Sequence, residues 1–149
     1  MWQVPILHGP NLNLLGIREP EIYGTLSFED VLDQLKQEFT QIKLPYHQSN
    51  HEGDLIDWLQ HYRLEADAIL LNAGAFTHTS IALRDAIQSV SLPVVEIHIS
   101  NIHARESFRQ HSIIQPACIF SVSGMGMDGY RAALKRLQEI LPAFAHFRA

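Results

Sequence analysis

The sequence predicts an α/β fold in which a parallel β-sheet is covered on both faces by helices. Short apolar segments alternate along the 149 residues with longer segments whose apolar residues recur at helical spacing. One short segment, Ala66–Leu71, is almost continuously apolar, which is typical of a strand buried on both faces. With right-handed crossovers, this order favours a flavodoxin-like, doubly wound, five-stranded parallel sheet in three layers, α/β/α.

The length and composition are those of one domain, which we expect to span residues 1–149. Apolar residues make up 46% and charged residues 18%, as in ordinary soluble proteins. The formal net charge of −5 argues against a nucleic-acid partner, for which a basic face is expected. We expect no membrane association and a cytoplasmic location, because the sequence has no apolar run of transmembrane length and no basic leader before its first strand.

Five segments have the length and composition of strands. Each is a short, mainly apolar run bounded by residues that favour turns. Pro45 places the second of them near a sheet edge, because proline cannot donate a hydrogen bond to a neighbouring strand. The predicted strands are Gln3–Leu7, Ile42–His47, Ala66–Leu71, Leu92–Ser100 and Ala117–Val122.

Four segments show the apolar spacing of helices. Ser27 is a good N-cap for the first, and acidic residues follow it in the first turn. Residues 101–115 are polar and are expected to be irregular or briefly helical. The second helix begins at Asn50 or Glu52, the third runs from Thr79 or Ser80 through Val90, and the fourth is Met127–Leu141. The apolar positions of the first two helices are Leu32, Leu35 and Phe39, and Leu55, Ile56, Leu59 and Tyr62. Those of the last two are Ile81, Leu83, Ala86 and Ile87, and Ala132, Leu134, Leu137 and Ile140.

A long loop, His8–Gly24, separates the first strand from the first helix. Its glycines and prolines interrupt both helical and strand periodicity. Loops of this length are usually functional or disordered, and the apolar residues within this one could dock on a core, which argues against disorder. We expect Pro10–Asn13 to be a fixed wall and residues 13–24 to form a mobile lid that carries Arg18 and Tyr23 over a site.

Polar residues recur inside the predicted strand Leu92–Ser100. Alternation places Glu96, His98 and Ser100 on one face, and the residues between them are apolar. A polar row in a strand covered on both faces is costly unless its groups pair, and Glu96 can hold the tautomer of His98. A histidine that is merely satisfied in the core is the alternative. Three polar residues at a carboxyl end favour a functional site.

Polar residues also follow the ends of other predicted strands. The carboxyl ends of parallel strands meet at one edge of the sheet, where doubly wound folds bind their ligands. We therefore expect these groups to converge. They are Asn11 and Asn13 after the first strand, Asn72 and His78 after the third, and His98 and Ser100 in the fourth.

Two arginines follow this strand. Arg105 and Arg109 are four residues apart, so one helical turn would place both guanidinium groups on the same side. Arginine presents a rigid fork of donors that suits carboxylates and hydroxyl groups. The pair therefore indicates an anionic, oxygen-rich ligand, and a solvated surface pair is the alternative.

Metal, dinucleotide and thiol chemistry are not favoured. The nine histidines form no His-Glu-x-x-His motif and no Cys/His pair with ligand spacing, so we expect no metal. Gly124–Gly129 matches G-x-G-x-x-G, but the further strand and acidic residue of a dinucleotide fold do not follow it, so a tight turn into the last helix is expected. Cys118 lies in an apolar run and is expected to be a small buried hydrophobe.

Seven short motifs follow one another along nearly the whole chain. They are Gly9–Gly16, Arg18–Pro20, Tyr23-Gly24, Gln48–Asn50 with Glu52-Gly53, Asn72–Ser80, Glu96–Asn101 and His103–Glu106. Together, in this order, they resemble the type II 3-dehydroquinate dehydratase family. One departure is Phe76, where many relatives are expected to have tyrosine. Phenylalanine keeps the ring, so we expect catalysis to be undisturbed.

The resemblance implies an enzyme of the shikimate pathway that removes water from 3-dehydroquinate, giving 3-dehydroshikimate. It implies an anti elimination through an enolate, without a metal or an organic cofactor. Tyr23 would be the general base. A free tyrosine has a pKa near 10, so a phenolate at neutral pH needs nearby positive charge. Arg18 and Arg105 are the candidates for supplying it.

The same resemblance assigns the other half of the reaction. Asn11 would stabilise the developing enolate, and His98 would protonate the departing hydroxyl while Glu96 orients it. The binding residues that it implies are Asn72, Ser100 and the backbone at Ile99 for the carboxylate, and Arg109 and His78 for hydroxyl groups.

The resemblance also implies an assembly of trimers grouped into dodecamers, in which Asp85 reaches a neighbouring subunit's site. The main alternative is a flavodoxin-like module that binds phosphate or flavin without catalysis. That module would need a loop rich in glycine, serine and threonine after the first strand, whereas Gly9–Asn13 is apolar and rich in amides. A structural scaffold, the third possibility, leaves Tyr23 and His98 unexplained.

Overall fold

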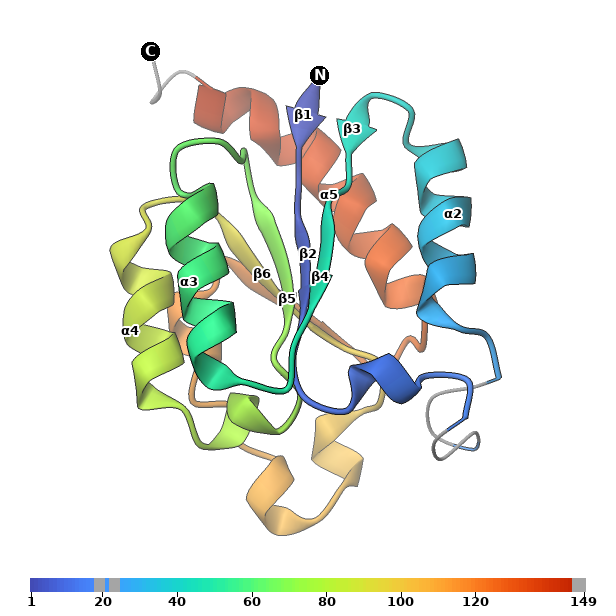
Figure 1. Ribbon diagram of the computed structural model, residues 1–149, viewed down its shortest axis with the longest axis vertical. Coiled ribbons are helices and arrows are strands. Elements are labelled where there is room, and N and C mark those ends of the chain that lie inside the picture. Colours follow the sequence, from blue (N-terminus) through green and yellow to red (C-terminus); the bar gives the residue numbers. More distant parts are fainter. Residues whose placement is uncertain (18–20, 22–24, 146–149) are drawn as a thin grey trace.

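A five-stranded parallel sheet runs through the computed structural model, which describes residues 1–17, 21 and 25–145 (Figure 1). Four helices flank the sheet: α2 (Phe28–Glu38), α3 (Glu52–Tyr62), α4 (Ile81–Ser89) and α5 (Asp128–Ala145). The sheet order is β4-β2-β5-β6-β7, and all neighbouring strands are parallel. Its strands are β2 (Ile6–His8), β4 (Tyr46–Gln48), β5 (Ile69–Asn72), β6 (Val94–His98) and β7 (Phe120–Ser123).

This order is that of a flavodoxin-like, doubly wound sheet, so the predicted fold class is confirmed. The chain starts in the interior of the sheet at β2, moves outward to β4, and then returns to the other side of β2 through β5, β6 and β7. The order therefore reverses between β2 and β5. In such folds a ligand binds at this reversal, beyond the carboxyl ends of the strands.

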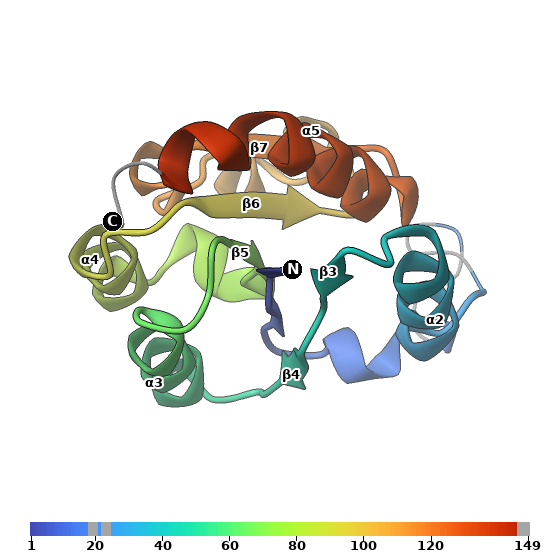
Figure 2. The same cartoon turned by 90° about the horizontal axis from the view of Figure 1, so that it is seen from above.

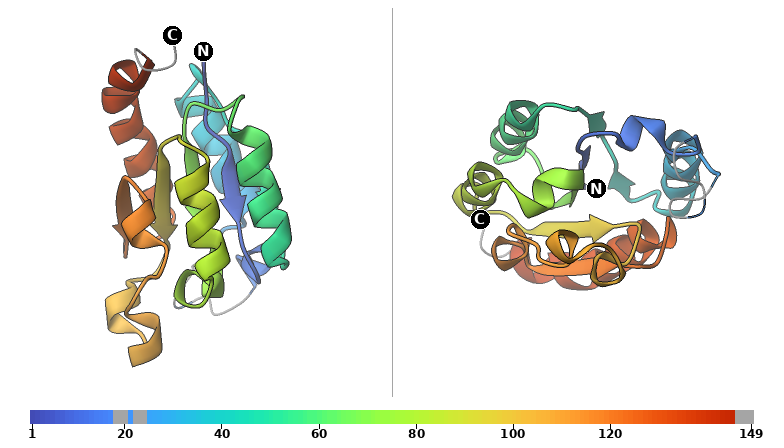
Figure 3. Two further views of the ribbon diagram at one scale, coloured as in Figure 1. Left: turned by 90° about the vertical axis from the view of Figure 1, so that its left-hand side faces the viewer. Right: turned by 90° about the horizontal axis from the view of Figure 1, so that it is seen from below.

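The helices cover the two faces of the sheet in pairs (Figures 2 and 3). On one face, α2 and α5 bury an apolar cluster that includes Phe28, Leu35 and Leu134. On the other face, α3 and α4 bury a second cluster that includes Leu55 and Leu83. Within the part of the chain that the structure describes, no helix is long and apolar enough to cross a membrane.

Two predicted strands are each interrupted by a proline. The first divides into β1 (Trp2–Gln3) and β2, with Pro5 between them, and the second divides into β3 (Ile42–Lys43) and β4, with Pro45 between them. Proline has no N–H to donate to the ladder, which explains both breaks. β1 and β3 pair with each other as a separate two-stranded sheet, and β4 is an edge strand, as the position of Pro45 predicts.

Side-chain caps agree with the sequence at two helices. Ser27 Oγ accepts a hydrogen bond from Asp30 N at 3.2 Å, and Ser80 Oγ accepts one from Leu83 N at 2.9 Å. Helix α3 begins at Glu52, one of the two predicted starts, with His51 as its N-cap. Ser49 Oγ accepts a hydrogen bond from the His51 N–H at 2.9 Å, which fixes the backbone just before the helix.

Other boundaries also differ from the predictions. The last strand begins at Phe120 instead of Ala117, because Gln115–Ala117 forms a 3₁₀ turn that contains Pro116. Helix α5 continues past Leu141 to Ala145 with Pro142 inside it. Leu141 is only 1% exposed, and its packing holds this end of the helix on the sheet. Ile81, one of the apolar positions of the third predicted helix, is exposed because it begins α4 on the outward side.

Candidate active site

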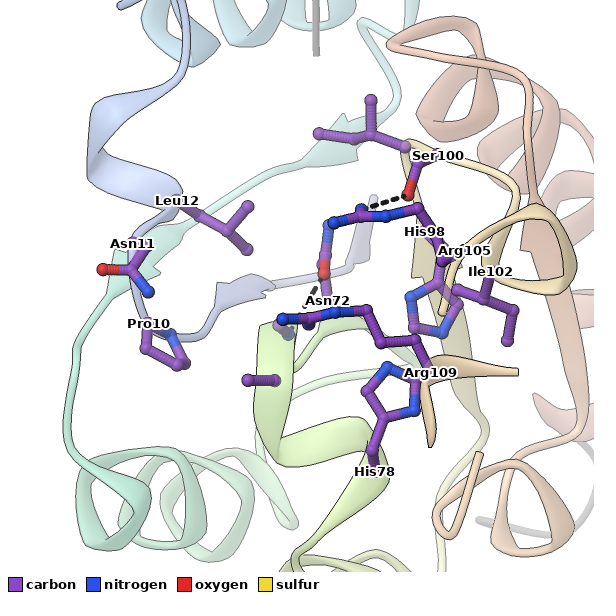
Figure 4. Close-up of a pocket in the computed structure, with 13 residues that line it drawn as sticks. Pro10, Asn11, Leu12, Asn72, His78, His98, Ser100, Ile102, Arg105 and Arg109 are labelled. Atoms are coloured by element: carbon purple, nitrogen blue, oxygen red, sulfur yellow. Dashed lines mark hydrogen bonds between the residues drawn. The ribbon is translucent and has the colours of Figure 1, made fainter. Parts of the chain in front are cut away.

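A cavity of about 100 Å³ opens where the sheet order reverses, beyond the carboxyl ends of β2, β5 and β6 (Figure 4). Figure 4 shows Pro10 and Asn11 on one side of it and His98, Arg105 and Arg109 on the other. Polar and charged side chains dominate the lining, as the predicted convergence requires. The lining residues are Pro10, Asn11, Leu12, Asn72, Gly74, Ala75, His78, His98, Ile99, Ser100, Ile102, Arg105 and Arg109.

Close contact between two loop backbones holds two sides of this cavity together. Gly9 N donates a hydrogen bond to Asn72 O at 2.8 Å, which ties the loop after β2 to the end of β5. A Cβ at Gly9 would lie 2.3 Å from the backbone oxygen of Ala73, so only glycine fits there. Gly74 has φ +59° and packs against Pro10. The glycines therefore bring Asn72 and the Pro10–Leu12 wall together.

Three of the four residues of the predicted wall line the cavity. Asn11 lines the cavity in the left-handed conformation at φ 69°, and its backbone N–H donates to Asn50 Oδ1 at 3.0 Å. Leu12 is 5% exposed and anchors the wall in the core. Asn13 was expected to converge with these groups, but it is not among the lining residues. Its Oδ1 instead accepts a hydrogen bond from Gln48 Nε2 at 3.5 Å, outside the cavity.

His98 and Glu96 form a buried pair in β6. His98 Nε2 lies 3.2 Å from Glu96 Oε1, and the two side chains are 7% and 0% exposed. The two atoms are close enough for an ion pair when His98 is protonated, but they are not in hydrogen-bond geometry. His98 lines the cavity and Glu96 lies behind it, which confirms that the two residues share a face of the strand.

Two hydroxyl groups hold Glu96 in place. Ser121 Oγ donates to Glu96 Oε1 at 2.8 Å from the neighbouring strand, and Ser112 Oγ donates to Oε2. Burial alone would raise the pKa of Glu96, but the contact with His98 and the two hydroxyl groups outweigh it and hold this pKa below its ordinary value. Glu96 is therefore a carboxylate at neutral pH despite its full burial.

Arg105 and Arg109 both line the cavity, as expected, although they do not share the single helical turn that their spacing suggested. Arg105 Nη1 donates to Ser100 Oγ at 3.3 Å, and Arg109 Nε lies 2.9 Å from Glu106 Oε2. The segment that carries them forms two 3₁₀ turns, Ile102–Ala104 and Ser107–Arg109, in agreement with the brief helical structure expected there. Two guanidinium groups at one cavity favour the binding of an anion there.

His78 occupies the third side of the cavity. Its Nδ1 lies 2.8 Å from the carbonyl oxygen of His111, which can only accept, so Nδ1 carries a proton. Nε2 is therefore the nitrogen left for a ligand. With Ser100 and the backbone of Ile99, His78 completes a polar lining.

Asp85 lies away from this cavity, and two other predicted site residues lie outside the described part of the chain. Asp85 is exposed on α4 and is not among the lining residues, so it can act only in a site other than this one. Tyr23 and Arg18, the predicted base and a source of its activating charge, lie outside the described residues, as does half of the predicted lid. Among the residues that the structure describes, no group of three or more His, Cys, Asp or Glu side chains could hold a metal ion.

The glycine motif and the cysteine are structural. Gly124 and Gly126 have φ values of +78° and +59° in the turn that leads to α5, so the predicted tight turn is confirmed. Cys118 is half-buried where full burial was predicted, because it precedes the edge strand β7. Burial and the nearby charge of Glu96 raise the pKa of its thiol to about 12, so the thiol is inert.

Sequence reasoning missed four residues that support the site. Ser112 and Ser121 hold Glu96, and His8 contacts Tyr130, which accepts a hydrogen bond from Asn72. Of these four residues, only Ser121 has a sequence pattern that could have indicated its role. It alternates with Phe120 and Val122 as a polar residue in an apolar strand, and it pairs in register with Glu96.

Comparison with known proteins agrees with this geometry. Residues 2–138 match the family model for dehydroquinase class II. A 3-dehydroquinate dehydratase of Caldicellulosiruptor bescii is 50% identical over 144 residues, covering 95% of this chain and 99% of that protein. One of Bacillus pumilus is 52% identical over 134 residues, covering 89% and 91%.

Solved structures show the same similarity. The crystal structure of a type II dehydroquinase from Butyrivibrio crossotus has a TM-score of 0.89 at 40% identity, covering 92% of this chain and 97% of that chain. The type II dehydroquinase of Propionibacterium acnes has a TM-score of 0.88 at 34% identity, covering 92% and 96%. The resemblance found from the motifs is thereby confirmed, and this chain belongs to the dehydroquinase class II family.

Proposed function

We propose that this protein removes water from 3-dehydroquinate to give 3-dehydroshikimate, by an anti elimination through an enolate. The observation that carries the proposal is the buried Glu96–His98 pair, which opens onto a cavity lined by two arginines in a dehydroquinase class II chain. In the reaction, a base takes the proton beside the ketone and the electron pair moves into an enolate. The enolate then expels the hydroxyl group, which leaves as water with a proton from the acid.

His98 is the acid that supplies this proton. Its imidazole lines the cavity, so it can reach a departing hydroxyl group. The carboxylate of Glu96, 3.2 Å from Nε2, compensates the positive charge while His98 holds the proton. Ser121 and Ser112 keep that carboxylate in place during the proton transfer.

The carboxylate of the substrate lies in a cradle formed by Asn72, Ser100 and the backbone at Ile99, all of which line the cavity. Arg109 and His78, on the same lining, bind its hydroxyl groups. His78 contributes Nε2 because its Nδ1 is engaged with the His111 carbonyl.

The base is Tyr23, and this assignment rests on the family motif. The side chain has to ionise near neutral pH although a free tyrosine has a pKa near 10. Positive charge from Arg18 and Arg105 favours the phenolate, and Arg105 is supported by its place at the cavity. Asn11, which also lines the cavity, donates to the oxygen on which negative charge develops in the enolate.

The assembly of trimers into a dodecamer and the cytoplasmic location stay predictions. Asp85 fits such an assembly, because it is exposed on the outer side of α4 and available to a second copy. In that arrangement its carboxylate would complete the site of a neighbouring subunit.

The test follows the ultraviolet absorbance of the enone product. The purified protein should convert 3-dehydroquinate in the presence of a chelator, and the absence of product would refute the proposed reaction.

His98→Ala should lower kcat by roughly 10²–10⁴, the range for general acid catalysis. A loss confined to KM would mean that His98 only binds. Full activity in Tyr23→Phe would refute only the assignment of the base.

A further inference from the structure

A chain of hydrogen-bonding side chains leads from the cavity into the core between the sheet and helices α2 and α5. Asn72 Nδ2 donates to Tyr130 Oη at 3.2 Å, and His8 Nε2 lies 2.7 Å from the same oxygen. His8 Nδ1 lies 3.0 Å from Tyr46 Oη. His8 and Tyr130 are both 0% exposed, and the His8 ring lies 4.2 Å from that of Phe28. Polar groups at this depth are stable only when they are paired.

The direction of each hydrogen bond follows from one backbone group. Gly74 N–H can only donate, and it donates to Asn72 Oδ1 at 3.2 Å. The orientation of the Asn72 amide is therefore fixed, and Nδ2 faces Tyr130. Tyr130 Oη accepts from Asn72, and among the hydrogen bonds of this buried hydroxyl His8 Nε2 is the remaining partner that can accept the tyrosine hydrogen. Satisfying that hydrogen therefore requires an unprotonated Nε2. His8 then carries its proton on Nδ1, toward Tyr46.

Burial supports this assignment of the protons. Desolvation lowers the pKa of His8 to about 3, so the ring stays neutral throughout the physiological range. Burial also raises the pKa of Tyr130, so its hydroxyl group keeps the hydrogen that His8 accepts. A cation at His8 would instead present a second donor to Tyr130 Oη and leave the tyrosine hydrogen without its acceptor.

We propose that Tyr130 and His8 are positioning residues that fix Asn72 as a hydrogen-bond donor to the carboxylate of the ligand. Nδ2 has two hydrogens. One is directed to Tyr130, and the other is available to the cavity that Asn72 lines. A rotated amide would present its oxygen instead, which repels a carboxylate. The inference rests on the proposed function, because it takes the ligand to be a cyclic hydroxy carboxylate such as 3-dehydroquinate.

The test compares two non-reacting analogues of 3-dehydroquinate on the purified full-length protein. Both have a hydroxyl group in place of the ketone, and only one keeps the carboxylate. Tyr130→Phe should weaken inhibition by the carboxylate analogue about tenfold, because a hydrogen bond to a charged group is less well oriented. Inhibition by the analogue without the carboxylate should change less than about twofold. Equal losses for both analogues, or no loss for the first, would overturn the proposal.

Tyr62→Phe is the matched control. Its hydroxyl lies 2.7 Å from His47 Nε2, so the variant also removes a tyrosine–histidine hydrogen bond, but at a place away from the cavity. It should leave inhibition by both analogues unchanged. A selective loss in this variant equal to that in Tyr130→Phe would count against the proposal, because the effect would not depend on Asn72.

Two substitutions at His8 test this chain of hydrogen bonds even if Tyr130→Phe does not fold. His8→Gln can place an acceptor near the position of Nε2 and should restore the wild-type preference for the carboxylate analogue. His8→Leu removes the acceptor and should show the selective loss. The proposal is wrong if the two variants lose affinity equally. Turnover of 3-dehydroquinate by the wild type is a separate readout, so failure of the proposed reaction and failure of this inference can be told apart.

Discussion

The buried His8 should make the stability of this protein depend on pH in a predictable way. In the folded chain the pKa of His8 is lowered to about 3 from 6.5. Below pH 6.5 the unfolded chain therefore binds a proton that the folded chain does not, and the free energy of unfolding falls as the pH falls. His8 contributes fully to stability above pH 6.5, and its contribution declines progressively from there toward pH 3.

The magnitude follows from the same two pKa values. At pH 5 the unfolded histidine is almost fully protonated and the folded one is not, which corresponds to a loss of about 2 kcal/mol relative to pH 8. By pH 3 the loss from this residue reaches about 4 kcal/mol. Glu96 adds to the decline below pH 4.5, because its folded pKa is also lowered. Measurements between pH 8 and 5 therefore exclude the contribution of Glu96.

The assay is urea denaturation of the wild type and of His8→Gln at pH 8 and pH 5, at one fixed protein concentration because assembly affects apparent stability. Glutamine does not titrate, and the other histidines are common to both proteins, so their contributions cancel. The stability difference between the two proteins should shift by about 2 kcal/mol in favour of the variant at pH 5. An identical dependence on pH in both proteins would refute the assignment of His8 as a buried neutral ring.

Three further predictions test the packing around the site. Gly9→Ala should destabilise the protein by about 3 kcal/mol in thermal or urea unfolding, because its Cβ would overlap a backbone oxygen at 2.3 Å. Gly53→Ala has open space and should be neutral or slightly stabilising, and a similar cost at both positions would contradict this reasoning. Ser121→Ala should cost about 2 kcal/mol in urea denaturation by removing a 2.8 Å hydrogen bond to the Glu96 carboxylate, and no measurable change would mean that this bond is not needed. Cys118 should not react with iodoacetamide at pH 8 until the protein is unfolded, since the pKa of its thiol is raised to about 12, and rapid labelling of the native protein would contradict this.

The features that the sequence predicts well are local ones. Ser27 and Ser80 cap their helices through backbone groups three residues away, so the relevant partners are adjacent in the chain. Glu96 and His98 share a strand face because of the two-residue period of β structure. The convergence of Asn72 and His98 follows from the rule that parallel strands end at one edge of the sheet.

The features that the sequence does not predict depend on partners far along the chain. His8 reads as the start of a loop, and nothing near it indicates that Tyr130 will meet it. His51 becomes an N-cap because Ser49 fixes the backbone before it, which propensities alone do not show. Cys118 is less buried than its apolar neighbours suggest, because the strand that follows it lies at the sheet edge.

The contact between His8 and Tyr130 also has a consequence for how the protein is made. These residues are 122 positions apart, and Tyr130 belongs to the final helix. During synthesis the loop after β2 emerges early, but the hydroxyl group that orients Asn72 is available only after α5 has docked. Contacts of such long sequence separation form late in folding. A nascent chain that lacks α5 should therefore have most of the sheet but no competent ligand site, so activity should arise only when the last helix is in place.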